Sequence, residues 1–393
     1  MAAARAFDRV TIGTNPVIST SAQQAIPSPT PAGRTHVRVI VAMSGGVDSA
    51  VAALLLHRQG YDVIGITMRL WSADDSAITP DHQGCCSIED VEDARRVCQT
   101  IGVPHYFLNV EREFRTHVMD YFVAEYQRGR TPHPCIACND RIKFDFLMRR
   151  ARFMDADYVA TGHHARLRYD SSSATHTLIK SADPSKDQSY VLFGLGQEQL
   201  AHLLLPVGDY TKEEVRALAA DGGLPVAGKA DSQEICFIPQ GDYRQFLRDR
   251  IAPQPGELVD TNGTVLGVHP GIEYFTVGQR RGLGIATGER LFVTRVEPDT
   301  RHVVLGTEEE LYHPAVWVTR VNYVAGVAPP GPFEVTAKVR YNSPAIPALL
   351  EPHSDGVVLR FAKPQRAIAP GQAAVFYHGD QLLGGGFIEQ PLD

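Results

Sequence analysis

The sequence predicts an α/β fold in which a parallel-sheet domain is followed by a small central domain and a C-terminal antiparallel β-barrel. Three observations lead to this prediction. Between residues 37 and 161, β-branched segments alternate with segments of helical periodicity, which is the pattern of βαβ units on a parallel sheet. A glycine-rich turn at residues 44–49 joins the first of these strands to the first helix. Beyond residue 290, short alternating strands separated by turn residues are typical of a small barrel or sandwich.

Length and composition agree with a multidomain globular enzyme. The chain has 393 residues, enough for two or three domains, and its 44% hydrophobic and 21% charged residues are ordinary for a soluble protein. It contains no uncharged apolar run of about 18 residues, so we expect no membrane span. The formal net charge of -7 argues against a nucleic-acid partner when the chain is taken as a whole. However, residues 128–168 hold nine basic and four acidic residues, a local net charge of +5.

Residues 1–35 are rich in Ala, Ser, Thr and Pro and predict a disordered extension. A transit peptide is the alternative, because the segment holds three Arg and one acidic residue. It lacks an Arg-rich amphipathic helix, however, and no secretory apolar region opens the chain. We therefore expect a reducing compartment, the cytoplasm.

The first ordered domain is expected over residues 36–209. Residues 37–43 form a β-branched run of the kind found in buried parallel strands. The further elements of this domain are expected at 50–57 (helix), 61–68 (strand), 91–101 (helix), 104–110 (strand) and 158–161 (strand).

The central domain is expected over residues 210–286. Thr211 and Glu214 fit a capping box at the start of a helix, with Val215 and Leu218 on one face. The third domain, over residues 287–393, is expected to be the barrel. Its strands are expected at 291–296, 316–324, 333–340, 356–361 and 373–377.

Residues 44–49, Ser-Gly-Gly-Val-Asp-Ser, predict a phosphate-binding loop. The glycines let backbone N–H groups approach an anion, the following helix presents the positive end of its dipole, and both serines can donate hydrogen bonds. The loop has no Walker-type lysine, so transfer of a γ-phosphate as in P-loop ATPases is not expected. A second run, residues 223–229, matches GxxxxGK, but Ala230 stands where Ser or Thr would hold magnesium and no strand precedes it. We interpret that run as an ordinary loop.

Six cysteines are too few for a disulfide scaffold, and three of them suggest sulfur, redox or metal chemistry. Cys135 and Cys138 form a CxxC pair close to Arg141 and Lys143, whose positive charge would lower a thiol pKa and make the thiolate a better nucleophile. Cys236 follows about 100 residues later. Taken alone, Cys236 would be interpreted as a buried core thiol.

The loop at residues 44–49 resembles the SGGxDS loop of the PP-loop ATP pyrophosphatases, the adenine nucleotide alpha hydrolase-like superfamily. These enzymes split ATP into AMP and pyrophosphate and adenylate a carbonyl oxygen. The chain also carries, in order, GRTPxPxxxCNxxIKF from residue 129, TGHHARL from 161, KDQSY from 186 and DSQEICFI from 231. Together these motifs resemble the tRNA-uridine 2-sulfurtransferase family, over residues 36 to the C-terminus.

The resemblance implies a reaction and its participants. ATP, with Mg²⁺ expected, would adenylate O2 of the wobble uridine of a tRNA. Cys236 would receive sulfur as a persulfide from a donor protein, and Cys138 would be the second catalytic cysteine, ending in a disulfide with Cys236. The residues that match ATP-binding positions are Ala42, Met43, Ser44, Gly45, Gly46, Val47, Asp48, Ser49, Met68 and Gly162.

The resemblance also implies contacts with tRNA. Positions beside the target base are matched by His133, Pro134 and Cys135. The other matching positions are His163, Lys186, Asp187, Gln188, Arg340, Tyr341 and Gln372.

One departure from the family pattern leaves the mechanism open. Many members have Asp at the position of Cys135, where it could act as a general base, and Asn at that of His133. The alternative is that Cys135, Cys138 and Cys236 ligate a [4Fe–4S] cluster. Two other functions stay open: another PP-loop enzyme that forms amides, which would not need the distant cysteines, and a non-catalytic RNA-binding protein with a barrel domain.

Overall fold

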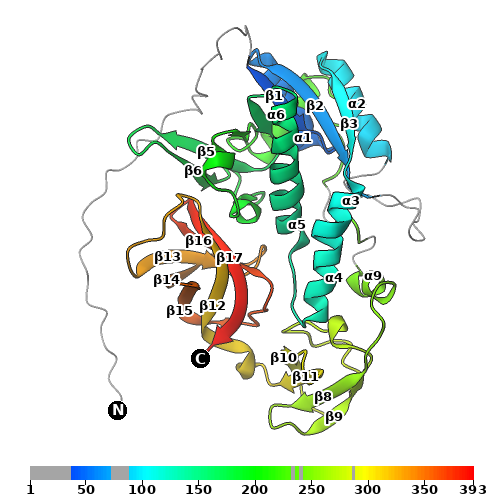
Figure 1. Cartoon of the computed structure of the whole chain (residues 1–393), viewed down its shortest axis with the longest axis vertical. Helices are drawn as coiled ribbons and strands as arrows, with labels where there is room; N and C mark the ends of the chain where they lie inside the picture. Colours follow the sequence, from blue (N-terminus) through cyan, green and yellow to red (C-terminus); the bar gives the residue numbers. More distant parts are fainter. Residues whose placement is uncertain (1–36, 72–87, 232–234, 239–241, 286–287) are drawn as a thin grey trace.

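The computed structural model describes residues 37–71, 88–231, 235–238, 242–285 and 288–393. The extension predicted over residues 1–35 lies outside these residues. A five-stranded parallel sheet, a small central sheet and a closed antiparallel barrel follow one another along the chain, which confirms the predicted fold class (Figure 1). No helix in the described ranges is both long and apolar enough to cross a membrane.

The parallel sheet has the strand order β3-β2-β1-β4-β7. Its strands are β1 (Arg38–Ala42), β2 (Asp62–Arg69), β3 (His105–Asn109), β4 (Tyr158–Ala160) and β7 (Leu203–Leu204). In its register Ala42 lies opposite Ile66, and Val41 lies opposite Ala160. The carboxyl ends of β1, β2 and β4 therefore meet at one edge, where open α/β sheets bind their ligands.

The two faces of this sheet pack against different helices. Val39 and Val41 belong to an apolar cluster with the helices of one face, whereas Ile40 points to the other face and joins a second cluster. The first face is covered by α1 (Val47–Arg58), α2 (Ile88–Ile101) and α8 (Lys212–Asp221). The second cluster includes residues of helical segments between residues 111 and 153. These segments are α3 (Glu111–Phe114), the π-helix η2 (Arg115–Met119), α4 (Asp120–Gln127), α5 (Pro134–Ala137), the π-helix η3 (Cys138–Phe146) and α6 (Leu147–Phe153). Of these, α4 runs away from the sheet toward the central domain (Figure 1).

Helix α8 begins as its sequence predicts. The Thr211 hydroxyl accepts a hydrogen bond from the Glu214 N–H at 3.3 Å, and the Glu214 carboxylate accepts one from the Thr211 N–H at 2.7 Å. Both partners of the predicted capping box are therefore in place. Val215 is fully buried in the same apolar cluster as Val39 and Val41, so α8 turns its predicted apolar face inward.

The central domain is a four-stranded sheet in the order β10-β11-β8-β9. Its elements are α9 (Tyr243–Arg248), β8 (Gly256–Asp260), β9 (Val265–His269), the 3-10 helix η6 (Ile272–Tyr274), β10 (Phe292–Glu297) and β11 (His302–Gly306). The prediction that the strand at 291–296 belongs to the C-terminal barrel is wrong, because β10 pairs with β11 of the central sheet. A short alternating strand shows which face it buries, but not which sheet it joins.

The barrel closes through six antiparallel strands. The order is β12-β15-β14-β13-β16-β17, and β17 pairs back with β12. These strands are β12 (Tyr312–Tyr323), β13 (Phe333–Lys338), β14 (Ile346–His353), β15 (Gly356–Arg366), β16 (Ala373–His378) and β17 (Gln381–Leu392), preceded by the 3-10 helix η7 (Glu309–Leu311). A hairpin of the first domain, β5 (Ala165–Asp170) and β6 (Thr175–Lys180), extends this sheet because β6 pairs with β17. Two short helices follow it, η4 (Ser189–Leu192) and α7 (Gln197–Leu200).

Arg130 joins the first domain to the barrel. Its guanidinium donates to the Glu125 carboxylate at 2.9 Å, to Glu389 at 2.8 Å and to the Ile388 carbonyl at 3.1 Å. The next residue, Thr131, donates its N–H to the Pro370 carbonyl at 2.7 Å. Glu125 is only 4% exposed, so its charge depends on this partner.

We expect Arg130→Met to lower the free energy of unfolding by about 3 kcal/mol, because it leaves the buried Glu125 carboxylate without its main partner. Arg128 also pairs with Glu125, but its side chain is 70% exposed, so Arg128→Met should cost less than about 1 kcal/mol. Urea denaturation of the two variants tests this difference. Equal losses in the two variants would contradict a stabilising role for the buried Arg130–Glu125 ion pair.

Candidate active site

The loop at residues 44–49 has the geometry of an anion-binding site. Gly45 adopts a φ of 73°, and a Cβ at this position would lie 2.3 Å from the Asp90 carbonyl oxygen, so only glycine fits. Ser49 stabilises the turn, because its hydroxyl donates to the Gly46 carbonyl at 3.1 Å and lies 3.2 Å from the Ser44 hydroxyl. No side chain caps the first turn of α1, so its backbone N–H groups face the loop.

The other residues expected to bind ATP lie at the same edge of the sheet. Gly162 follows β4, and a Cβ there would lie 2.5 Å from the Ser49 backbone nitrogen, so Gly162 closely contacts the loop. Met68 lies near the end of β2 and is 9% exposed. The loop, Gly162 and Met68 therefore surround the carboxyl ends of three neighbouring strands, although their binding of ATP stays a prediction.

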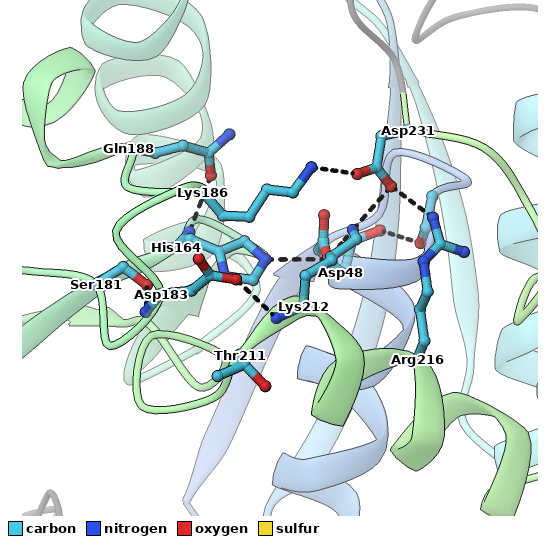
Figure 2. Close-up of polar contacts among 12 residues, drawn as sticks. Asp48, His164, Ser181, Asp183, Lys186, Gln188, Thr211, Lys212, Arg216 and Asp231 are labelled. Atoms are coloured by element: carbon cyan, nitrogen blue, oxygen red, sulfur yellow. Dashed lines mark hydrogen bonds and ion pairs between the residues drawn. The ribbon is translucent and has the colours of Figure 1, made fainter.

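An ion-pair network joins this loop to two distant segments of the chain (Figure 2). Lys212, the first residue of α8, places its ammonium group 2.6 Å from Asp48 of the loop and 3.0 Å from Asp231. Asp231 also pairs with Lys186 at 2.8 Å and with Arg216 at 2.8 Å. Lys212 is only 9% exposed, so its charge is compensated mainly by these two carboxylates.

The charges of the network fix the ionisation of its carboxylates. Burial opposes the ionisation of Asp48, but hydrogen bonds from His164, at 3.1 Å, and from Lys212 lower its pKa. Burial likewise opposes the ionisation of Asp231, but Lys186 and Lys212 lower its pKa to about 2. Both groups are therefore carboxylates at neutral pH, and the network carries alternating charges.

Four residues of this region were missed by sequence reasoning: His164, Lys212, Lys229 and Asp231. Lys229 ends the GxxxxGK run, which is a loop as predicted, but its ammonium group reaches the Gly45 carbonyl at 3.1 Å and Asp90 and Asp93 at 2.7 Å. His164 lies in the TGHHARL motif and Asp231 begins the DSQEICFI motif, so both could have been proposed as site residues from the sequence. Lys212 offered none, because it looks like any first-turn residue of a surface helix.

The two cysteines expected to be catalytic lie in well-packed surroundings. Cys138 is 7% exposed and begins η3, a π-helix of nine residues, which is a form that often marks functional sites. Cys236 is half-buried, and its carbonyl accepts a hydrogen bond from the Trp71 indole at 3.1 Å. The next residue, Phe237, packs edge-on against Phe122 at 5.4 Å. Cys138 is part of the same apolar cluster against which Cys236 packs.

An aromatic group forms around His133, two residues before the first cysteine of the CxxC pair. The His133 ring lies 5.9 Å from both Tyr190 and Tyr341. Burial raises the pKa of Tyr341, and the charges of Asp187 and Cys135 raise it further. Burial lowers the pKa of His133 to about 4, so its ring is neutral at pH 7. Within the described residues the buried Nδ1 of His133 has no hydrogen-bond partner.

The other residues expected to contact tRNA are held by protein contacts. In the KDQ segment, Lys186 pairs with Asp231, Asp187 accepts the Ser181 N–H at 3.0 Å, and Gln188 accepts the His164 N–H at 2.9 Å. The segment is therefore a structured loop beside the ion-pair network.

His163 is buried and bonded to Thr161 at 2.8 Å, so in this conformation it lies below the surface. Arg340 donates to the Ala367 carbonyl, and Gln372 donates to the Thr131 carbonyl at 2.9 Å. Pro134, the first residue of α5, is buried. None of these contacts tests tRNA binding, which stays a prediction.

The three thiols do not fit a [4Fe–4S] cluster in this arrangement. Cys135 is exposed whereas Cys138 is buried. Over the described ranges, no group of three His, Cys, Asp or Glu side chains is placed to hold a metal ion. We therefore derive no reaction step through a cluster.

Comparison with known families accounts for each of the three domains. A family model described as a tRNA methyl transferase HUP domain matches residues 37–240. A model described as a tRNA methyl transferase PRC-barrel domain matches residues 244–307, and one described as an aminomethyltransferase beta-barrel domain matches residues 314–388.

Curated relatives match almost the full chain. A tRNA-specific 2-thiouridylase of Desulforamulus reducens is 50% identical over 358 residues, which cover 90% of this chain and 98% of the relative. The enzyme of the same name from Pelotomaculum thermopropionicum is 49% identical over 91% of this chain and 98% of its own length. That of Moorella thermoacetica is 49% identical over 89% of this chain and 99% of its own length.

We expect Lys212→Met to weaken ATP binding at least tenfold, because the Asp48 carboxylate would then repel the nucleotide phosphates. Lys212→Arg keeps the charge and serves as the matched control. Isothermal titration with ATP measures both variants, and thermal melting checks that they fold. An unchanged ATP affinity in folded Lys212→Met would contradict the role given to this lysine.

The pKa of Asp231 predicts an acid-dependent loss of stability. Its folded-state pKa of about 2 lies below the unfolded value of about 3.9, so its contribution is present above pH 4 and is lost as the pH falls toward 2. Asp231→Asn should remove about 1 kcal/mol of the pH-dependent free energy of unfolding, because solvent screens this partly exposed ion pair. Urea denaturation between pH 2 and 5 measures it, with the exposed Asp355→Asn as control. Parallel stability curves for wild type and Asp231→Asn would refute the pairing.

Proposed function

Because this chain belongs to the tRNA-specific 2-thiouridylase family, we propose that it replaces O2 of the wobble uridine of tRNA by sulfur, at the expense of ATP. The observation that carries this proposal is the shared position of Lys212. It binds Asp48 in the phosphate loop and Asp231 at the start of the Cys236 motif. One cation thus joins the segment suited to ATP to the segment suited to sulfur transfer.

The first step is activation of the uracil. The loop at residues 44–49 holds the ATP phosphates through backbone N–H groups and the serine hydroxyls. The uracil O2 attacks the α-phosphorus, the bond to pyrophosphate breaks, and an O2-adenylate forms. This step converts O2, a poor leaving group, into AMP. The N3–H proton of the uracil passes to solvent as the neutral O2-adenylate forms, and N3 takes up a proton again when 2-thiouridine is released.

The second step is sulfur transfer. Cys236 carries the sulfur as a persulfide received from a donor protein. The terminal sulfur attacks C2, AMP leaves with the former O2, and the sulfur remains linked to Cys236. The Cys138 thiolate then attacks the Cys236 sulfur, the sulfur–sulfur bond to the uridine breaks, and 2-thiouridine is released. The transferred sulfur gains the two electrons that the cysteines lose in forming a disulfide, and a thiol reductant restores them.

The CxxC pair lies in a basic stretch of the sequence, which suits a tRNA substrate. The stretch over residues 128–168, with its local net charge of +5, contains Cys135 and Cys138. Exposed arginines of this stretch, among them Arg141 and Arg150, attract the tRNA backbone in spite of the acidic whole chain. The neutral His133, with its unpartnered Nδ1 among the described residues, could hydrogen-bond the extruded base.

We place this reaction in the cytoplasm, with Mg²⁺ bound mainly through the ATP phosphates. Magnesium commonly uses one or two carboxylates in addition to phosphate oxygens. Asp48 is the carboxylate in the phosphate loop, but Lys212 already binds it, so no magnesium ligand set is assigned.

The deciding experiment incubates the protein with ATP, a persulfide donor and unmodified tRNA, and detects 2-thiouridine by mass spectrometry of the nucleosides. We expect Cys236→Ala and Cys138→Ala to lose thiolation by at least a hundredfold under persulfide supply. Both should still release pyrophosphate in the presence of tRNA, because adenylation precedes sulfur transfer.

Cys98→Ala is the matched control. Cys98 is fully buried in α2, and burial raises its pKa to about 11, so it is not a nucleophile at neutral pH. Product formed without ATP, or full activity in Cys236→Ala, would refute the proposed mechanism.

A further inference from the structure

A positively charged pocket lies where the three domains meet, and none of the roles given above uses it as a whole. It has a volume of about 530 Å³ and is lined by residues of α4, α9, the segment after η6 and the barrel. Three arginines line it, Arg244 from α9, Arg340 after β13 and Arg366 at the end of β15. We call it the junction pocket.

The charge of the junction pocket is not balanced within it. None of its lining residues is an Asp or Glu. Arg366 pairs at 3.1 Å with Glu308, which does not line the pocket and is 54% exposed. Arg244 and Arg340 donate to neutral carbonyl groups, of Tyr274 at 3.1 Å and of Ala367. Three guanidinium groups facing one cavity repel one another unless an anion neutralises them.

The arginines are held in place before any ligand arrives. The Arg244 guanidinium lies 5.3 Å from the centre of the Tyr243 ring, and that ring stacks on Tyr126 at 4.9 Å. Arg366 lies 5.2 Å from the centre of the Phe292 ring. Stacking fixes the planes of these side chains, which lowers the entropy that a ligand must remove on binding.

The backbone of the junction pocket is also tightly constrained. Ala367 adopts a φ of 53°, which is unfavourable for a residue with a side chain. Its N–H donates to Leu311 at 2.7 Å, and its carbonyl accepts from Arg340. A Cβ on Gly278 of the central domain would lie 2.7 Å from the Ala367 Cβ, so the two domains touch here. Strained backbone held by several contacts is typical of functional sites.

Two residues that line the pocket lie close in the sequence to residues expected to contact the target base or the tRNA. Thr131 lines it, and Cys135 follows four residues later, a chain distance of at most about 14 Å. On the barrel side Arg340 lines it, and the next residue, Tyr341, contacts the His133 ring. An RNA strand that places a base beside Cys135 therefore brings its neighbouring phosphates toward these arginines.

We propose that the junction pocket binds a phosphate group of the tRNA backbone next to the target uridine, through Arg244, Arg340 and Arg366. This inference rests on the proposed function, because it takes tRNA as the substrate. Arg244 and Arg366 thereby become tRNA-binding residues, in addition to the positions that the family resemblance supplies. The central domain gains a role, since it contributes one of the three cations that hold the RNA against the barrel.

The test measures tRNA binding by Arg244→Gln and Arg366→Gln at several salt concentrations. Each variant should bind unmodified tRNA about tenfold more weakly at low salt. The slope of the logarithm of the association constant against the logarithm of the salt concentration should become shallower by about 0.7 to 1, the value expected for one phosphate contact. Arg366→Lys should keep most of the slope, because it keeps the charge.

Arg360→Gln is the matched control. Arg360 lies on the same strand as Arg366 and pairs with Glu351, but it does not line the pocket. Its tRNA affinity and salt slope should equal those of the wild type, and thermal melting verifies that every variant is folded. Wild-type affinity and slope in both Arg244→Gln and Arg366→Gln would overturn the proposal.

Titration with inorganic pyrophosphate distinguishes a free anion from an RNA phosphate. If the two variants lose pyrophosphate binding but keep the wild-type salt slope for tRNA, the pocket serves a free anion and the proposal is overturned. Failure of the proposed function has a different signature, since the wild type would then form no 2-thiouridine whatever the salt slopes of the variants.

Discussion

Lys212 lies between two carboxylates, Asp48 and Asp231, that the proposed mechanism assigns to different steps, and the geometry of the site depends on this arrangement. Asp48 is part of the phosphate loop, and Asp231 begins the segment that ends in Cys236. Both carboxylates lie within 3.0 Å of the Lys212 ammonium group. Without this buried cation they would repel each other and the phosphates of ATP. The lysine therefore allows a phosphate loop without a Walker lysine to lie beside a second acidic group.

This constraint explains how distant motifs of the chain work as one site. Asp231 also binds Lys186, so the KDQ loop is held beside the first residue of the DSQEICFI motif, and Gln188 of the same loop accepts the His164 N–H. Each carboxylate has more than one cationic or hydrogen-bonding partner, so a change in one segment affects the others.

Much of the fold could be predicted from sequence because local patterns specify it. The β-branched run at residues 37–43, the turn at 44–49 and the capping box at Thr211 each have a physical cause within a few residues. Sheet membership has no such local cause, and the strand at 292–297 was therefore assigned to the wrong sheet. For the site, residues in long motifs could be proposed, but Lys212 and Lys229 become visible only when the fold brings them to the loop. The three arginines of the junction pocket come from separate segments and share no pattern in sequence.

The path of a single oxygen atom tests the proposed mechanism most directly. A tRNA carrying ¹⁸O at O2 of the wobble uridine is incubated with the protein, ATP and a persulfide donor, and AMP is analysed by mass spectrometry. Adenylation of O2 predicts that the label appears in AMP, one atom for each 2-thiouridine formed. Label found in pyrophosphate or water, with unlabelled AMP, would contradict activation of the uracil by adenylation.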